Sequence, residues 1–376
     1  MPVRGANRPK VVAPRPKPKV ITRPRSFTLA NTEFGETLAA VHARFGKEVA
    51  TNRVVIPYAD RIPTGIFPLD IALSGGWLTS RGSMLYGERS SGKTTIAMMT
   101  CVRAQIMYPD QVCVWIDIEG TFDIEWFVKL GGDPERLYVV EPESGENAVD
   151  MAQAFASTKE VAVIVTDSIA MLIPMKEIEE SSETAMMGVH ARLIGNYLRK
   201  LNNAMLVERH RGHKILILHI NQFRMKIGVV FGDPRTLPGG KALEFCTTQQ
   251  VETKNKEVLS DKGDIKHNEH SFKITKDKTG GRIREGKFKL VRDPDYNNGL
   301  PEGTIDQIKT MHELAGAVGL TDEGRIAFRG YGKWNSAADA QLALLADPEK
   351  YAALQWDILM AYRKKWGLSV PTEYED

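Results

Sequence analysis

The fold is decided by one stretch of sequence, Gly87-Glu88-Arg89-Ser90-Ser91-Gly92-Lys93-Thr94, which has the pattern G-x-x-x-x-G-K-T. An apolar run at residues 83–86 precedes it and predicts a strand, and residues 95–107 predict a helix after it. In that setting the glycines let backbone N–H groups turn inward and hold phosphate oxygens, helped by the helix N-terminus. We call this stretch the phosphate loop. It predicts that the chain binds a nucleoside triphosphate.

The last residues of the phosphate loop have predicted roles in binding. The Lys93 ammonium would reach the β- and γ-phosphates, and the Thr94 hydroxyl would bind Mg²⁺. Thr95 follows in the first turn of the helix and is counted with the binding residues. The alternative is a glycine-rich strand-to-helix turn with a chance lysine, but the flanking strand and helix favour phosphate binding.

Short apolar runs alternate with helix-like segments along the middle of the chain. Their hydrophobicity is continuous rather than alternating, which indicates strands that are buried on both faces. Helices would cover both faces of such a sheet. The sequence therefore predicts an α/β fold of phosphate-loop NTPase type with a mostly parallel, twisted sheet. The predicted strands are residues 83–86, 112–116, 138–140, 161–165 and 215–220.

Polar side chains follow three of these runs, at the edge where an open parallel sheet binds ligands. Asp167 comes after the fourth run and would hold Mg²⁺ through water. Glu119 follows the second run and is the predicted base for the attacking water, and Gln222 follows the fifth as the predicted γ-phosphate sensor. The alternative is that Asp117 and Glu119 cap the next helix.

The net charge of +3 hides a strong asymmetry along the chain. Of the 50 basic residues, eight lie in residues 1–25, which hold no acid, and this leaves 42 basic against 47 acidic residues elsewhere. This Pro-rich segment is predicted to be a disordered arm that either solubilises the chain or contacts phosphates. Its six prolines disfavour a mitochondrial transit helix, and no secretory apolar region follows it.

Other classes of protein are excluded by composition. No apolar run is long enough to span a membrane. Three widely separated cysteines argue against a disulfide framework or a zinc site and suit a reducing interior. We therefore expect a cytoplasmic location.

The chain divides into four predicted segments. The disordered basic tail covers residues 1–26, and an N-terminal arm with an amphipathic helix covers residues 27–60. The ATPase core would occupy residues 61–300. Helix-like stretches at 304–318, 337–345 and 350–365 predict a small, mainly helical C-terminal domain over residues 301–376.

The stretch from Asn221 to Gly240 combines basic residues, apolar side chains and glycines in a way that is unusual for a surface loop of a globular protein. Cations that track a nucleic-acid backbone, interleaved with apolar wedges, are typical of a channel for a single strand. The alternative is a buried β-hairpin, and the residues alone leave these two interpretations even. The side chains and glycines that suggest the channel are Arg224, Lys226, Ile227, Phe231, Arg235, Gly239 and Gly240.

The chain resembles RecA-type homologous recombinases from about Arg61 to Asp293, through the stretches 64–73, 90–95 and 221–232. The last stretch is the most specific, and it favours the DNA loop over the hairpin. The resemblance implies a RecA-like core and an ATP-dependent strand-exchange protein. Such a protein forms a helical filament on single-stranded DNA and pairs that strand with homologous double-stranded DNA. Residues 27–60 would be the polymerisation arm that docks on a neighbouring subunit. Its cofactors would be ATP and Mg²⁺, and hydrolysis to ADP and phosphate would reset DNA binding.

The resemblance also implies roles for residues near the nucleotide. Lys276 and Lys278 would reach the ATP of the next subunit and stabilise the transferred phosphoryl group, whereas the sequence alone fits an ordinary strand edge. Asp123 and Trp126 match the positions that hold the adenine, with Trp126 as a stacking platform.

A second DNA loop is implied at residues 179–188. Without the resemblance, its methionines fit a core stripe and the two arginines behind it fit a solvated helix face. The implied contacts are Met186, Met187, Arg192 and Arg199.

Several positions depart from the family pattern. Arg89 stands where the bacterial proteins carry Glu, and Glu244 stands where they usually have Lys, which puts the subunit contact there in question. Residues 293–299, the C-terminal part and the basic tail do not follow the pattern. Such divergence would suit a phage- or plasmid-encoded relative.

Two other functions stay open at this point. A ring-forming ATPase such as a helicase would need a separate N-terminal domain, whereas only a tail and one predicted helix precede the core. A nucleotide-switched DNA-binding scaffold would use hydrolysis only to reset binding. Single-strand-binding and mediator proteins are further candidate partners, and no membrane contact is expected.

Overall fold

The computed structural model describes residues 33–46, 60–179, 188–225, 234–279, 281, 283–368 and 370, without the side chains of Phe45 and Glu244. The basic tail and residues 47–59 of the predicted N-terminal arm lie outside these residues. The predicted N-terminal helix is described as α1 (Glu33–Phe45).

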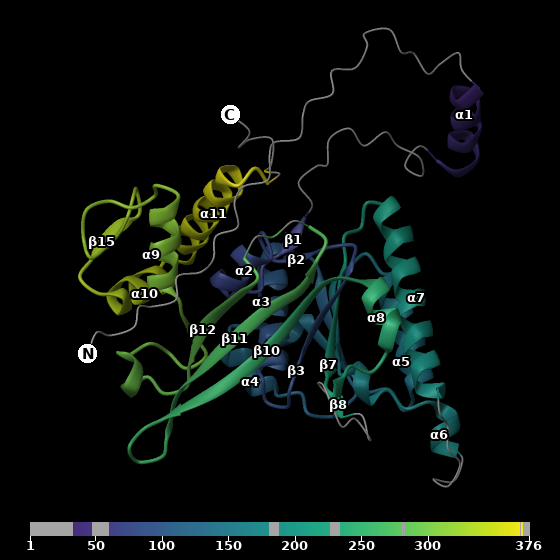
Figure 1. The fold of residues 1–376 in the computed structure, drawn as a ribbon, viewed down its shortest axis with the longest axis horizontal. Coiled ribbons are helices and arrows are strands. Elements are labelled where there is room, and N and C mark those ends of the chain that lie inside the picture. Colours follow the sequence, from purple (N-terminus) through teal and green to yellow (C-terminus); the bar gives the residue numbers. More distant parts are fainter. Residues whose placement is uncertain are drawn as a thin grey trace.

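A nine-stranded sheet forms the centre of the molecule (Figure 1). Six neighbouring strands, from β10 to β5 in the order below, pair in parallel, and the remaining pairs are antiparallel. The predicted α/β fold with a mostly parallel sheet is therefore confirmed. The strand order is β13 (Ile305–Asp306), β12 (Glu285–Val291), β11 (Ile265–Asp277), β10 (Thr247–Leu259), β3 (Gly82–Gly87), β7 (Leu216–Gln222), β6 (Val161–Asp167), β4 (Val112–Asp117) and β5 (Leu137–Val140).

Helices cover both faces of the parallel strands, which explains the continuous hydrophobicity of those strands. Two hydrophobic clusters fill the layers between the helices and the sheet, one on each face. All seven residues of β6 are buried as a result. One layer contains α2 (Phe67–Ala72), α3 (Lys93–Met107) and α4 (Ile124–Lys129), and the other contains α5 (Gly145–Ala156), α7 (Val189–His210) and α8 (Gly240–Cys246).

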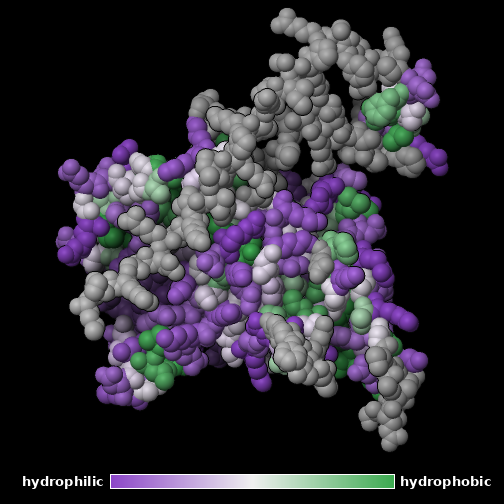
Figure 2. All heavy atoms as spheres, viewed as in Figure 1, coloured by the Kyte–Doolittle hydropathy of each residue, from purple (hydrophilic) through white to green (hydrophobic). Residues whose placement is uncertain are grey.

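Strands β10, β11 and β12 differ from the parallel strands because one of their faces meets solvent. Lys254 and Lys256 are exposed on that face, while Val251 and Thr253 point to the other side and are buried. Figure 2 shows that the face of the molecule over these strands is largely hydrophilic. The alternation is the pattern expected of an antiparallel sheet with a single covered face.

A third hydrophobic cluster joins the C-terminal elements to α2, through Phe67 and Ile71. Its elements are α9 (Ile308–Ala317), β14 (Ile326–Phe328), β15 (Gly332–Trp334), α10 (Ala337–Leu345) and α11 (Pro348–Lys365). The helix predicted over residues 304–318 begins only at Ile308, because Ile305 and Asp306 pair with β12 as strand β13.

Short elements complete the described chain, in which no helix is both long and apolar enough to cross a bilayer. Three of them are 3₁₀ turns. The short elements are β1 (Arg61–Ile62), β2 (Trp77–Leu78), η2 (Pro134–Arg136), η3 (Ile169–Met171), α6 (Met175–Glu179), β8 (Arg224–Met225), β9 (Arg235–Thr236) and η4 (Asp295–Asn297).

One of the buried histidines lies on a parallel strand and packs against α7. His219 on β7 is 1% exposed, and its ring meets the Tyr197 ring edge-on at 5.4 Å. The described residues provide no hydrogen-bond partner for its Nδ1 atom. Burial therefore lowers the pKa of His219 from its usual 6.5 to about 4.

We predict that His219 makes the fold sensitive to acid. The folded state binds this proton less readily than the unfolded chain, so the contribution is complete above pH 6.5 and is lost as the pH falls toward 4. The loss is about 3 kcal/mol for this shift. Urea unfolding of His219→Gln between pH 7 and pH 4 should show a shallower decline than wild type. The control His210→Gln, outside the core, should keep the wild-type decline.

Candidate nucleotide site and adjoining loops

The phosphate loop leaves β3 at a point where only glycine fits. A Cβ atom on Gly87 would lie 2.3 Å from the Thr253 carbonyl oxygen of β10 and 2.7 Å from Ser91 Oγ. The loop ends at Gly92, which precedes α3 with a φ of +88°. A Cβ atom on Gly92 would lie 2.4 Å from His270 Cε1. The backbone of β10 and the His270 ring of β11 therefore pack directly against the phosphate loop.

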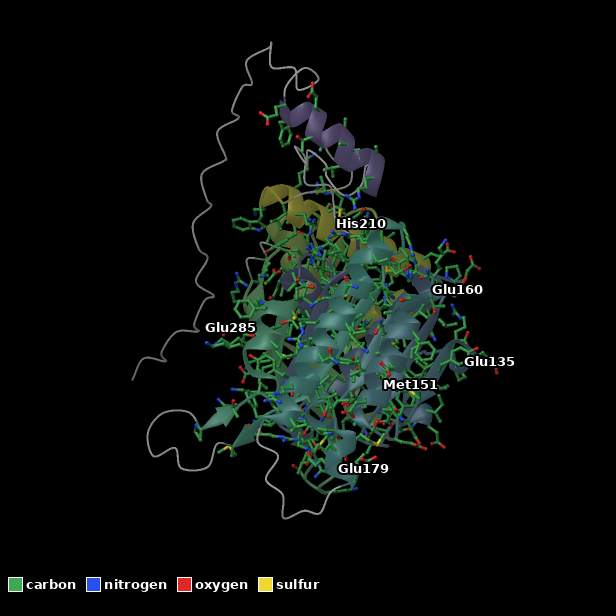
Figure 3. All side chains as sticks on the ribbon, turned by 90° about the vertical axis from the view of Figure 1, so that its right-hand side faces the viewer. Glu135, Met151, Glu160, Glu179, His210 and Glu285 are labelled. Carbon is green, nitrogen blue, oxygen red and sulfur yellow. The ribbon has the colours of Figure 1, made fainter. Side chains whose placement is uncertain are left out.

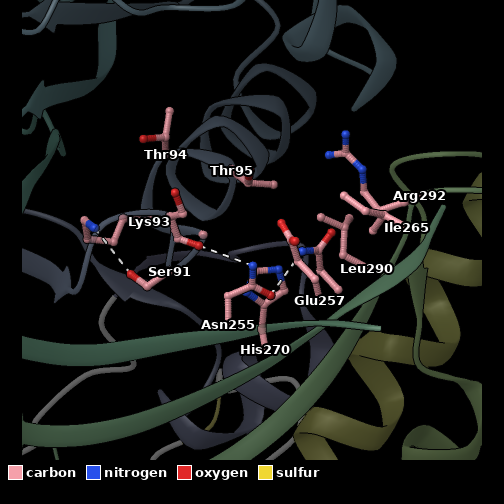
Figure 4. Close-up of a pocket in the computed structure, with 13 residues that line it drawn as sticks. Ser91, Lys93, Thr94, Thr95, Asn255, Glu257, Ile265, His270, Leu290 and Arg292 are labelled. Carbon is pink, nitrogen blue, oxygen red and sulfur yellow. Dashed lines mark hydrogen bonds between the residues drawn. The ribbon is translucent and has the colours of Figure 1, made fainter. Parts of the chain in front are cut away.

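Lys93 is enclosed by its own loop. Its Nζ donates to the Glu88 carbonyl oxygen at 2.7 Å and to Ser91 Oγ at 3.3 Å (Figure 4). The residue is 5% exposed, and burial lowers the pKa of its ammonium group. An ammonium group enclosed among carbonyl and hydroxyl oxygens suits a polyanionic ligand such as a triphosphate.

The two residues predicted to hold Mg²⁺ lie together. Thr94 Oγ1 donates to Asp167 Oδ2 at 2.7 Å, across the start of α3 and the end of β6. Burial raises the pKa of Asp167 to about 7, because the loss of solvent outweighs the opposing effects of the Thr94 hydrogen bond and the nearby Lys93 ammonium. Among the described residues no cluster of three His, Cys, Asp or Glu side chains could hold a metal. A hydroxyl and a carboxylate that share Mg²⁺ with substrate phosphates nevertheless fit this ion.

Glu119 lies at the centre of the strand ends. Its Oε1 atom accepts a hydrogen bond from Gln222 Nε2 at 2.5 Å and another from Ser168 Oγ at 2.8 Å. The predicted base and the predicted γ-phosphate sensor are thus in direct contact. Sequence reasoning missed Ser168, although its position directly after Asp167 was a usable signal.

The capping alternative for Glu119 is wrong. Asp123 caps α4 by accepting from the Trp126 backbone N–H at 2.9 Å. Asp117 instead shapes the loop after β4, where its carboxylate accepts from the backbone N–H groups of Gly120 at 3.0 Å and Phe122 at 2.8 Å. Asp117 therefore has a structural role, which leaves the Glu119 side chain available at the site.

A cavity of about 270 Å³ lies between the phosphate loop and strands β10 to β12. Figure 4 shows Asn255 and His270 rising from the strands beneath the loop, and Arg292 on the far side beyond Thr95. Asn255 Nδ2 donates to the Ser90 carbonyl oxygen at 3.3 Å. The His270 ring stacks on Phe288 at 4.8 Å. No local sequence pattern marks Asn255, His270 or Arg292 as residues of this cavity.

The residues predicted to bind adenine adjoin this cavity. Trp126 Nε1 donates to Thr95 Oγ1 at 3.3 Å, which connects the ring to the first turn of α3. The Arg292 guanidinium lies 4.6 Å from the centre of the Trp126 ring, so a cation–π contact occupies one face of the ring that is predicted to stack on the base. Arg292 lies 3.6 Å from a carboxylate oxygen of Glu302.

Lys276 and Lys278 lie away from the phosphate loop of their own chain. Lys276 pairs with Gln250, which pairs with Met84 near the start of β3, whereas the phosphate loop leaves the other end of that strand. The Lys276 Nζ donates to the Thr247 carbonyl oxygen at 2.6 Å, still further from the loop. The backbone N–H of Lys278 donates to the Thr248 carbonyl oxygen at 3.3 Å.

The elements that border the two predicted DNA loops lie at one end of the molecule, where α6 and β8 are close to the lower edge of Figure 1. Figure 3 places Glu179, the last residue of α6, at this end and His210 at the opposite end. Exposed Arg192 and Arg199 lie along α7 between them. The predicted contacts Met186, Met187, Lys226, Ile227 and Phe231 lie outside the described residues.

The ends of the predicted DNA loop at residues 221–240 contact the protein itself. Arg224 donates to the Ala170 carbonyl oxygen. The Arg235 guanidinium lies 4.7 Å from the centre of the Phe223 ring and 3.8 Å from a carboxylate oxygen of Glu88 in the phosphate loop. Gly239 precedes α8 with a φ of +92°, and Gly240 is the first residue of that helix.

We predict that alanine at Gly92 distorts the phosphate loop. The φ of +88° and the approach of His270 both oppose a Cβ atom there. Gly212→Ala is a matched control, since Gly212 has a φ of +84° with open space around it. The control should lose about 1 kcal/mol in urea unfolding. Gly92→Ala should lose more unfolding free energy than the control and should bind a fluorescent ATP analogue weakly. Adding His270→Ala to Gly92→Ala should partly restore this binding. Equal losses of unfolding free energy in Gly92→Ala and Gly212→Ala would contradict this prediction.

Comparisons with known proteins agree with this geometry. The RecA N-terminal domain family matches residues 33–300. Protein RecA of Petrotoga mobilis is 33% identical over 82% of this chain and 81% of its own length. Protein RecA of Aquifex aeolicus is 34% identical over 81% of this chain and 83% of its own length. The mitochondrial DNA repair protein recA homolog of Dictyostelium discoideum is 32% identical over 82% of this chain and 62% of its own length. This chain belongs to the RecA family.

Proposed function

We propose that the chain is an ATP-dependent recombinase that forms a filament on single-stranded DNA and pairs the strand with homologous duplex. One observation supports this function above the others. Glu119, the predicted base, contacts Gln222, which is the last residue of β7 and lies at the start of the predicted DNA loop. A nucleotide at the phosphate loop and a strand at the DNA loop would therefore act on the same side-chain pair.

Different residues of the site have different roles in ATP hydrolysis. The phosphate loop backbone and Lys93 bind and orient the triphosphate. Mg²⁺, when bound at Thr94 and Asp167, neutralises charge on the β- and γ-phosphates. Glu119 orients the attacking water and accepts its proton, and Gln222 contacts the γ-phosphate. When the γ-phosphate leaves, Gln222 loses that contact, and the DNA loop that follows it is released.

Lys276 and Lys278 are proposed to act on the ATP of a neighbouring subunit. Their position toward the start of β3 supports this, because the phosphate loop of the same chain lies beyond the other end of that strand. Two cations would stabilise charge on the transferred phosphoryl group, as an arginine finger does. The head-to-tail contact that this requires produces an open helical assembly when its rotation does not close a ring.

We predict that Lys93→Ala removes hydrolysis and filament activation together. The variant lacks the cation that orients the β- and γ-phosphates, so phosphate release should fall to background. Electron microscopy with an ATP analogue and single-stranded DNA should show no extended filaments. Lys350→Ala, an exposed lysine of α11, is the control and should match wild type. Intact ATP-stimulated strand exchange by Lys93→Ala in a D-loop assay would refute the scheme.

The same measurements on wild type separate the alternatives. Closed rings in place of filaments would favour a helicase-like ATPase. Filaments that coat DNA without forming D-loops would favour the nucleotide-switched scaffold.

Mixing two inactive variants tests the lysines between subunits. Glu119→Gln lacks the base but keeps the phosphate loop that binds nucleotide, so it should still assemble, and the double variant Lys276→Ala/Lys278→Ala lacks the donated cations. In a random one-to-one mixture, a quarter of the interfaces combine an intact Glu119 with intact lysines. We expect hydrolysis to recover to about a quarter of the wild-type rate. A mixture as inactive as its components would place the lysines outside the neighbouring site.

A further inference from the structure

Three strand ends meet at Glu119 in a fixed order. In the sheet, β6 lies between β4 and β7. Glu119 follows β4, Ser168 follows β6 and Gln222 ends β7. The side chain of Glu119 therefore has to pass over the end of β6 to reach Gln222. The residue that it passes is Ser168.

Ser168 suits this position in both size and chemistry. The residue is 0% exposed, and its hydroxyl donates to the same Glu119 Oε1 atom that accepts from Gln222. A larger side chain would obstruct the carboxylate, and an alanine would leave the oxygen with a single donor. Two donors from opposite sides restrict the rotation of the carboxylate better than one.

A further hydrogen bond connects the segments that follow β6 and β7. Arg224, two residues after Gln222, donates to the carbonyl oxygen of Ala170, two residues after Ser168. The contacts Ser168–Glu119, Gln222–Glu119 and Arg224–Ala170 therefore join both segments and the carboxylate into one closed network. A purely structural serine at the end of β6 would not need to contact the base.

We propose that Ser168 is a positioning residue for hydrolysis, which holds the Glu119 carboxylate against Gln222 in the geometry that orients the attacking water. This inference rests on the proposed function in one respect, the role of Glu119 as the base. Ser168 itself touches neither the nucleotide nor the metal in this role. Its effect should therefore appear in the rate of the chemical step and not in nucleotide affinity.

The test is steady-state ATP hydrolysis by the full chain, first without DNA and then with single-stranded DNA. Ser168→Ala should lower kcat about tenfold, because the base loses its fixed orientation, and should leave KM for ATP within about twofold. Ser144→Ala is the matched control, since Ser144 is a buried serine whose hydroxyl caps α5 by accepting from the Asn147 backbone N–H. It should keep the wild-type kcat, and thermal unfolding should show both variants folded.

The background of Glu119→Gln shows whether Ser168 acts through the base. If it does, adding Ser168→Ala to Glu119→Gln should lower kcat no further. An unchanged kcat in Ser168→Ala, a rise in KM alone, or a second tenfold loss in the Glu119→Gln background would each overturn the proposal.

These outcomes stay distinct from failure of the proposed function. A wild-type protein that hydrolyses ATP without any response to DNA would refute the recombinase. The comparison of kcat values without DNA would then still decide the role of Ser168.

Discussion

The register of β3 against its two neighbours is the constraint on which the rest of the site depends. Gly87 pairs with Gln222 of β7 on one side and with Thr253 of β10 on the other. The phosphate loop therefore begins level with the residue proposed to sense the γ-phosphate. The approach of the Thr253 carbonyl oxygen leaves no room for a side chain at Gly87. A slip of one residue in either pairing would turn the polar strand ends away from the nucleotide.

The parallel strands and their polar ends were predictable because strands that are buried on both faces have a recognisable apolar sequence. Strands covered on both faces, such as β6, need apolar residues at successive positions, and a parallel sheet gathers their polar ends at one edge. This is why the sequence alone predicts that Asp167, Glu119 and Gln222 lie at one site. The phosphate loop was identified in the same way, from a motif together with the strand and helix that flank it.

The part formed by β10 to β12 was not predictable by the same means. One face of these strands meets solvent, and on β10 and β11 part of the opposite face lines the nucleotide cavity instead of the core. Asn255 and His270 therefore occupy positions where a hydrophobic residue would have revealed the strand. Cross-strand contacts such as that between Arg292 and Trp126 join residues far apart in the chain, and local sequence patterns contain no record of them.

The predicted adenine-binding residue Trp126 already has a cation, the Arg292 guanidinium, on one face of its ring. A base that stacks on that face would have to displace the guanidinium or stack upon it. Exposed cation–π contacts contribute about 0.5–1 kcal/mol, whereas base–aromatic stacking contributes about 1–3 kcal/mol. Stacking of the base would therefore compensate for the loss of the cation–π contact.

The separation of Lys276 from the phosphate loop along β3 has a consequence for assemblies of different length. With the lysines acting between subunits, every complete catalytic centre belongs to a pair of neighbours. A filament of n subunits then contains n − 1 complete centres, and a lone subunit contains none. Short assemblies on DNA would hydrolyse slowly per subunit and long ones at a constant limiting rate. The terminal subunit that lacks a lysine donor would keep its ATP longest, so turnover at the two ends of the filament would differ.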